Sequence, residues 1–382
     1  MTPMRIGFFT EVYRPVVNGI VASLDSLAKT LRDAGHEVYF FAPRVPGYDE
    51  ADGPVFRMPS LPLPTNTEYR LTLPLVNRRN VNEIVRRLSV IHAHSPFVTG
   101  WLGRHLARRF GIPLVYTYHT QLEQYVHYVP LGAQTMRRAA SSLTRLYANT
   151  ADTVIVPTIA MHAHLRATGV RRPIEIVPSG IDLAQFGAGR RSAAVRARYG
   201  VEPGERLALF VSRLALEKNA AVLLEALALA RAPARLVLAG EGPDRERLAA
   251  LAERLGLRGR AVFAGQIARE ALPELYASAD VFVFPSVTET QGLVLAEALA
   301  AGCPAIAVDT PQAREVLGTA ATYVSPTPQA IAEAIDAVPA EPAAGSAAAA
   351  RAAAARFDVV LQRDRLLGIY RGLAAGHIAT PA

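Results

Sequence analysis

The chain of 382 residues contains a single cysteine, Cys303, which excludes an internal disulfide framework. Cysteines and histidines do not recur at the spacing of a zinc site. No apolar run is long enough to span a bilayer, and the first 15 residues lack the apolar core of a signal peptide. These absences favour a cytoplasmic protein without a structural metal.

Lysine is also scarce: 39 of the 41 basic residues are arginines. One of the two lysines, Lys218, lies in the segment LFVSRLALEKN, just beyond an apolar strand expected at 207–211, and Arg213 comes five residues before it. A compact ammonium and a forked guanidinium at the carboxyl end of a strand suit a diphosphate. The alternative is a pair of solvated surface cations.

Length and composition indicate two globular domains. The chain is 51% hydrophobic and 19% charged, as in globular proteins, and it is too long for one ordinary core. Two series of apolar strands alternate with helical patterns, which predicts an α/β fold with two parallel sheets wrapped on both faces. The first series is expected at 4–10, 37–42, 90–94, 113–119, 153–157 and 174–177, and the second at 207–211, 235–239, 261–264, 280–284 and 304–308.

The domain boundaries follow from these series. We expect a first domain over residues 1–183 and a second over 184–357, joined by a turn-rich linker near 180–204. A last helix over 358–374 carries an apolar stripe that includes Leu361 and Tyr370 and therefore needs a partner surface. Ligands of open α/β sheets bind beyond the carboxyl ends of the strands, so two facing domains would line a cleft.

Charge is uneven along the chain. Residues 1–183 carry 20 Lys and Arg against 13 Asp and Glu, a net charge of +7, whereas residues 184–382 are nearly neutral. Segments such as WLGRHLARRFG place arginines at helical spacing beside apolar residues. Helices of this kind dock on anionic lipid surfaces, each cation contributing about 1 kcal/mol, and a solvated helix face explains them equally well. No basic stripe is interleaved with aromatic residues, so nucleic-acid binding is not expected.

Two glutamates flank the start of a helix in the segment DVFVFPSVTETQGLVLAEALAAG. An apolar strand over 281–284 leads into a loop and then into a helix that opens near Gly292 or Leu293. The first N–H groups of such a helix can bind an anion. Glu289 lies in the loop and Glu297 lies about one turn into the helix, so two acceptors flank amides that suit a diphosphate. This arrangement fits a nucleotide sugar; the alternative is a loop carboxylate and a surface carboxylate without a ligand.

The opening segment RIGFFTEVYRPVVNGI predicts a strand, a turn and a helix that starts at Gly19, where backbone N–H groups can approach a phosphate. It lacks G-x-G-x-x-G, which argues against a dinucleotide-binding dehydrogenase. Histidines end two later strands: His92 and His94 end the first of them, and His119 ends the second. A histidine at this place can position or polarise a substrate hydroxyl. For His94, structural hydrogen bonding is the alternative.

Together these segments resemble the retaining glycosyltransferases of the GT-B fold, in the large family that includes sucrose- and glycolipid-forming transferases. The resemblance covers essentially the whole chain. TEVYRPVVNG, TYHTQLEQYVHY and TETQGLVLAEAL are most similar to diacylglycerol glucosyltransferases; HAHSPF, VPSGID, SRLALEKN and LAGEGPDRERL complete the pattern. It implies two Rossmann-like domains facing a central cleft. The first binds the acceptor and is completed by a C-terminal helix at about 358–382; the second binds the nucleotide sugar.

The resemblance also implies how the donor diphosphate is held. Arg213 and Lys218 match the pair of cations that hold it, and Gly19 matches a loop glycine near the phosphate. The amides of Gly292 and Leu293 match those that face the sugar and the phosphate.

The sugar and the nucleoside are assigned in the same way. Glu289 matches a glutamate that contacts sugar hydroxyls, and Glu297 matches one that binds the ribose. His119 matches a histidine near the anomeric centre, so catalysis is expected to involve His119, Arg213, Lys218 and Glu289. This chain has the sequence E-T-Q-G where the commoner family motif is E-G-F-G, and this difference leaves the identity of the donor sugar open.

The activity implied by the resemblance is transfer of a hexose, expected to be glucose from UDP-glucose, to a lipid acceptor such as diacylglycerol. Family members retain the anomeric configuration through same-face attack and need no metal or cofactor. We expect a cytoplasmic enzyme that can lie on the inner membrane face. Three alternatives are a GDP-mannose-dependent mannosyltransferase acting on an inositol lipid or other polyol, a nucleotide-sugar epimerase or phosphorylase on the same fold, and a non-catalytic sugar-nucleotide-binding protein.

Overall fold

The computed structural model describes residues 2–48, 53–63, 66–73, 78–124, 132–339 and 345–378. The chain forms two compact units. The first unit comprises Met1–Gly180 with Val359–Ala382, and the second unit comprises Ile181–Asp358. The sequence pattern predicts divisions after residues 183 and 357, whereas the structure divides the chain after residues 180 and 358.

The first unit contains a seven-stranded parallel sheet with strand order β3-β2-β1-β6-β7-β8-β9. The strands are β1 (Arg5–Phe9), β2 (Glu37–Pro43), β3 (Val55–Met58), β6 (Val90–Ala93), β7 (Leu114–Thr117), β8 (Thr153–Val156) and β9 (Ile174–Ile176). The central strands are buried along nearly their whole length, as parallel strands covered on both faces must be. An antiparallel hairpin, β4 (Ser60–Leu63) and β5 (Asn66–Thr72), adds to this unit.

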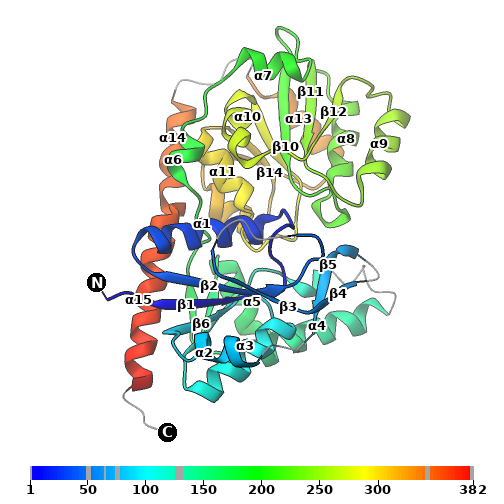
Figure 1. Cartoon of the computed structure of the whole chain (residues 1–382). Coiled ribbons are helices and arrows are strands. Elements are labelled where there is room, and N and C mark those ends of the chain that lie inside the picture. The colour runs from blue at the N-terminus through cyan, green and yellow to red at the C-terminus, as the bar shows by residue number, and fades with distance from the viewer. Residues whose placement is uncertain are drawn as a thin grey trace. The chain divides into compact units, whose positions relative to one another are not determined.

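Helices cover both faces of this sheet (Figure 1). They are α1 (Gly19–Asp33), α2 (Arg78–Val85), α3 (Val98–Phe110), α4 (Ala133–Ala148), α5 (Ile159–Ala167) and α15 (Val359–Ile378). Phe8 packs with α1 and α15, while its neighbour Phe9 packs with α2, α3 and α4, because successive side chains of a strand point to opposite faces. Leu366, Leu367 and Tyr370 provide the buried stripe of α15, but Leu361, expected to belong to it, is exposed.

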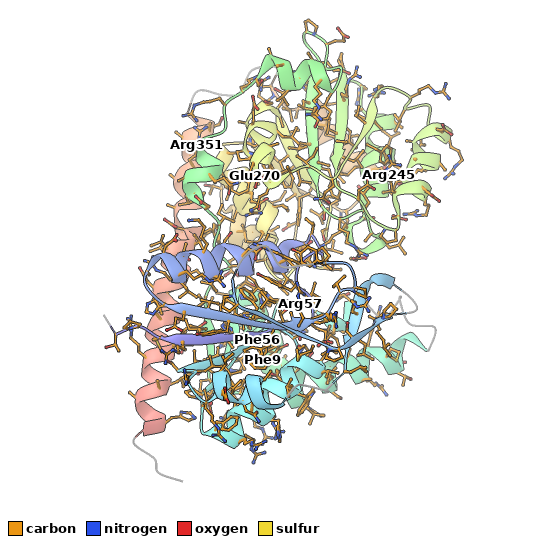
Figure 2. The ribbon with its side chains drawn as sticks, viewed as in Figure 1. Phe9, Phe56, Arg57, Arg245, Glu270 and Arg351 are labelled. Carbon is orange, nitrogen blue, oxygen red and sulfur yellow. The ribbon has the colours of Figure 1, made fainter. Side chains whose placement is uncertain are left out.

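The loop that leads into α1 is held by the edge of the sheet. Arg57 on β3, labelled in Figure 2, donates to the carbonyl oxygens of Pro43 and Arg14, both at 2.8 Å. The Asn18 side chain then caps α1 by accepting from the Val21 N–H at 2.9 Å. Gly19 is therefore the first residue of a capped helix, as the sequence predicts.

The second unit contains a six-stranded parallel sheet with strand order β12-β11-β10-β13-β14-β15. Its strands are β10 (Arg206–Val211), β11 (Ala234–Ala239), β12 (Ala261–Gly265), β13 (Val281–Phe284), β14 (Ala305–Val308) and β15 (Ala321–Val324). One face packs against α8 (Ala220–Leu229), α9 (Arg245–Arg254) and α13 (Pro328–Asp336). The other packs against α10 (Leu272–Ser278), α11 (Leu293–Ala301), α12 (Pro311–Leu317) and α14 (Ser346–Ala354).

The segment expected to be a linker, 180–204, belongs to the second unit from Ile181 onward. It forms α6 (Leu183–Gly187) and α7 (Ala193–Arg198), and Phe186 is fully buried. Arg191 and Arg196 contact the buried carboxylate of Asp280 at 2.5 and 2.8 Å. The polar composition that suggests a linker instead supplies partners for a buried charge.

Candidate active site

Each sheet has one point at which the strand order reverses. In the first unit it lies between β1 and β6, and in the second it lies between β10 and β13. Loops that leave the carboxyl ends of the strands diverge at such a point and form the usual ligand site of an open α/β sheet. Arg213, Lys218 and Glu289 follow β10 and β13, whereas His94 follows β6. His94 thus lies at the reversal point of the first unit and the other three lie at that of the second, whereas His119 follows the neighbouring strand β7.

A pair of glycines sets the backbone around Arg213. A Cβ atom on Gly240 would lie 1.9 Å from the Ser212 carbonyl oxygen, and one on Gly242 would lie 2.3 Å from that of Leu214. The Leu214 N–H donates to the Glu241 carbonyl oxygen at 2.9 Å. Only glycine permits this approach, so the G-E-G segment after β11 supports the backbone that presents Arg213.

Lys218 and Glu289 lie together although 71 positions separate them. Lys218 ends a short 3-10 helix, η3 (Leu216–Lys218), and its Nζ atom is 2.5 Å from Glu289 Oε1. The Ser286 hydroxyl donates to the same carboxylate oxygen at 3.1 Å. The side chains of Lys218 and Glu289 are only 16% and 20% exposed, so this is a partly desolvated ion pair.

Arg213 also faces a carboxylate. Its Nη1 atom is 3.8 Å from Oε1 of Glu217, a buried residue that the sequence did not single out. Glu217 directly precedes Lys218 in the chain. Both cations of the expected diphosphate site are therefore adjacent to carboxylates, and an anionic ligand would compete with those carboxylates for them.

The helix that follows Glu289 begins where the sequence predicts. Gly292 is the N-cap of α11 with φ +79°, a conformation that favours glycine. Because glycine has no side-chain acceptor, no side chain at this position caps the helix. The first turn contains no acidic residue that would offset the positive end of the helix dipole. The start of α11 at Leu293 can thus receive an anion through its backbone N–H groups.

Glu297 lies on α11 but is only 3% exposed. Arg269 donates to Oε1 at 3.0 Å and the Tyr276 hydroxyl donates to Oε2 at 3.1 Å. Burial raises the pKa of Glu297, and the opposing charge of Arg269 lowers it. A carboxylate accepts about four hydrogen bonds, so Glu297 retains capacity for a ligand. The sequence did not identify Arg269 or Tyr276 as its partners.

The first unit contains a cavity of about 230 Å³ at its own reversal point. Glu11, Arg70, His94, Ser95 and His119 are among its lining residues. Gly19 itself is not among them, but the next residue in the chain, Ile20, is. The remaining surface of the cavity is mainly apolar, so the polar groups are few and defined in position, as in small-molecule sites.

Three histidines lie together at this cavity: His94 and His119 line it, and the His92 ring packs against that of His94 with centroids 4.1 Å apart. Nδ1 of His94 is 3.0 Å from Nε2 of His119. His92 contacts the Tyr370 hydroxyl through Nδ1 and the Thr117 hydroxyl through Nε2, each at 2.6 Å. Burial lowers the pKa of His92 to about 3 and that of His119 to about 4, and it lowers the pKa of His94 well below 6.5. All three rings are therefore neutral at pH 7, and each can both donate and accept.

This cluster predicts a pH dependence of stability. Below about pH 6.5 the unfolded histidines take up protons that the folded ones do not yet bind, since burial lowers the pKa of His119 to about 4, that of His92 to about 3 and that of His94 well below 6.5. The free energy of unfolding therefore falls as pH falls below about 6.5. One such histidine contributes a slope of up to about 1.4 kcal/mol per pH unit. Urea unfolding of His94→Gln should show a shallower slope between pH 4.5 and 6 than the unaltered protein. His162→Gln, a change on α5 outside the cluster, should keep the original slope; equal slopes in all three proteins would contradict this account.

Glu11 is a cavity residue that the sequence reasoning missed. The backbone N–H groups of Thr72 and Thr99 donate to its two carboxylate oxygens at 2.8 and 3.0 Å. Glu11 thereby ties the end of β5 to the first turn of α3. The only signal in the sequence is an acidic residue immediately after a buried strand, which by itself does not specify these partners.

Within the described residues, no group of three or more His, Cys, Asp and Glu side chains is placed to hold a metal ion. A search of the same residues finds no helix with the length and apolar character needed to cross a bilayer.

Comparison with known proteins relates both units to sugar transfer. The family model described as glycosyl transferases group 1 matches residues 192–356, and that of glycosyltransferase family 4 matches residues 17–185. The chain is 33% identical over 318 residues to the alpha-monoglucosyldiacylglycerol synthase of Streptococcus pneumoniae, covering 81% of this chain and 72% of that protein. It is 34% identical over 328 residues to a GDP-mannose-dependent alpha-mannosyltransferase of Mycobacterium tuberculosis, covering 83% and 82%.

Solved structures support the fold. Sucrose-phosphate synthase from Thermosynechococcus elongatus superposes with a TM-score of 0.79 over 98% of this chain and 100% of that one, at 24% sequence identity. Two parallel-sheet Rossmann-like units, as expected from the strand pattern, are the architecture of this group. The chain belongs to the group 1 glycosyltransferases of the GT-B fold and is a glycosyltransferase.

Proposed function

We propose that this enzyme transfers glucose from UDP-glucose to a hydroxyl of a lipid such as diacylglycerol, with retention of the anomeric configuration. The observation that carries the donor half of the proposal is the Lys218–Glu289 pair at the reversal point between β10 and β13. It joins the segment after β10, which carries Arg213 and Lys218, to the loop that leads into the start of α11. The acceptor half rests on the pneumococcal relative, whose name describes synthesis of a glucosyl diacylglycerol.

In this proposal the donor diphosphate takes the place of carboxylates around the two cations. Its oxygens would bind Lys218, Arg213 and the N–H of Leu293, and Glu289 would turn from Lys218 to the sugar hydroxyls. Glu297, held by Arg269 and Tyr276, would accept from the ribose. Charge that builds on the diphosphate during bond breaking is stabilised by donors that are already in place.

The proposed transfer step needs no carboxylate nucleophile from the enzyme. The bond between the anomeric carbon and the phosphate oxygen breaks, a bond from the same carbon to the acceptor oxygen forms on the same face, and the acceptor proton passes to the leaving phosphate. His119, neutral at pH 7, would orient a hydroxyl as a hydrogen-bond partner rather than as a charged group. The step requires neither a metal nor a cofactor, so a chelator should leave turnover unchanged.

A second donor has support of its own. The mycobacterial relative is named as GDP-mannose-dependent, and it is as similar to this chain as the pneumococcal one. In that case the enzyme would transfer mannose to an inositol lipid or another polyol.

One assay separates these functions. The purified protein is incubated with radiolabelled UDP-glucose, UDP-galactose or GDP-mannose, each with diacylglycerol, with phosphatidylinositol and without acceptor. We expect labelled α-glucosyl diacylglycerol from UDP-glucose. Mannosylated phosphatidylinositol from GDP-mannose would favour the second donor, conversion of UDP-glucose without acceptor would indicate an epimerase, and no labelled lipid in any mixture would refute the proposal.

We also propose that the first unit binds anionic membrane surfaces, because its arginines project from amphipathic helices. Arg108 on α3 and Arg137 and Arg138 on α4 are exposed. The protein should sediment with vesicles that contain phosphatidylglycerol and stay in the supernatant with pure phosphatidylcholine. Equal recovery in both supernatants would remove the membrane proposal without affecting the sugar chemistry.

A further inference from the structure

A second hollow on the first unit lies between α3, α4 and the end of β5. Its volume is about 590 Å³, and it is more open than the histidine cavity. Its lining is almost wholly apolar: Val98, Trp101 and Leu102 come from α3, Leu143 comes from α4, and Leu71 comes from β5. We call it the α3–α4 groove.

The groove and the histidine cavity are neighbours. Leu71, Pro96 and Phe97 line both of them. The side chains of Leu71 and Phe97 are 43% and 40% exposed, which is unusual for large apolar residues beside a polar site. A single molecule can therefore have a polar end near His94 and His119 and an apolar tail along α3.

Cations accompany the groove residues on α3. Arg104 stands over the Trp101 ring at 5.2 Å, and the exposed Arg108 continues the face of α3 that carries Trp101 and His105. Among the described residues, neither arginine forms an ion pair with a carboxylate. An apolar hollow with a cationic border suits a lipid tail entering from an anionic surface, and it disfavours a basic peptide.

We infer that the α3–α4 groove holds one acyl chain of the acceptor lipid, while the acceptor hydroxyl lies in the histidine cavity. This assignment rests on the proposed transfer to a lipid. It adds that the enzyme selects acceptors by the length of an acyl chain bound inside the first unit. This selection is separate from any attraction of the enzyme to a membrane surface. Each methylene that enters an apolar site contributes about 0.8 kcal/mol, equivalent to about a fourfold gain in kcat/KM.

Short-chain acceptors test the groove without a membrane. Dibutyryl and dihexanoyl glycerol are compared at concentrations below micelle formation, with the donor that the assay above identifies. In the unaltered enzyme, kcat/KM should be about fifteenfold higher for the hexanoyl acceptor, because two more methylenes enter the groove. Leu143→Gln should reduce that ratio severalfold.

Leu146→Gln is the matched control, since it makes the same change three residues later on α4. Leu146 is 58% exposed and does not line the groove, so this variant should keep the original ratio. Product formation with an unchanged ratio in Leu143→Gln would overturn the groove assignment and leave the proposed function intact. If the unaltered protein proves dimeric and Leu143→Gln is monomeric with an unchanged ratio, the groove is instead covered by a second copy of the chain. No product from any acylglycerol would remove the lipid-transfer proposal and this assignment with it.

Discussion

Replacing Lys218 with alanine is expected to lower kcat by about 10²–10³-fold, the loss seen when one preorganised donor to a developing negative charge is removed. Lys218 pairs with Glu289 at 2.5 Å and only 16% of its side chain is exposed, so a diphosphate that takes the place of this carboxylate would meet a partly desolvated ammonium. Steady-state rates with saturating donor measure the effect. Glu289→Ala should also abolish transfer, because it removes the carboxylate expected to contact the sugar.

The chain provides a matched control, since its only other lysine is Lys29. Lys29 pairs with Asp33 on the exposed side of α1, at 72% exposure, so Lys29→Ala should keep normal turnover. Thermal unfolding of all variants checks that the fold is intact. Normal rates in both Lys218→Ala and Glu289→Ala would refute the assignment of the donor site.

Replacing Arg269 with methionine is expected to destabilise the protein by about 3–5 kcal/mol, because it leaves the buried carboxylate of Glu297 without its cation. Glu297 is 3% exposed and would then keep only the hydrogen bond from Tyr276. Urea unfolding at pH 7 measures the loss. The double variant Arg269→Met/Glu297→Gln removes the unpaired charge as well, and it should recover part of the stability.

The same pair of variants tests the role of Glu297 in ligand binding. If Arg269 serves to hold Glu297 toward a ribose, uridine diphosphate should bind the double variant more weakly than the unaltered protein even where stability returns. Stability that is unchanged by Arg269→Met would contradict the importance of this ion pair. Normal nucleotide affinity in the double variant would remove Glu297 from the site and leave its structural role.

The α/β architecture was predictable because its strands are short apolar runs between helical patterns. The expected strands all appear, and the segment WLGRHLARRFG, with its arginines at helical spacing, lies almost entirely in α3. The hairpin of β4 and β5 was missed because its segment contains prolines and polar residues, which disfavour a strand pattern. The edge strand β15 was missed because Ala321–Val324 is only partly buried and lacks a clear apolar run.

The candidate site was predictable where it depends on local sequence. The start of α11 follows from the strand, loop and helix pattern around Gly292, and the cations follow from their place after β10. The partners of these residues were not predictable. Arg269 meets Glu297 across 28 positions and Lys218 meets Glu289 across 71, so only the folded sheet brings them together. Burial likewise sets the neutral state of His119, which no local pattern reveals.

The most direct test of the central claim is a crystal structure of this protein with bound uridine diphosphate. We predict that the diphosphate lies within hydrogen-bonding distance of Lys218 Nζ and the backbone N–H of Leu293, with Arg213 completing the contact. A diphosphate bound at other residues, with the Lys218–Glu289 pair unchanged and α11 without a ligand at its start, would contradict the account.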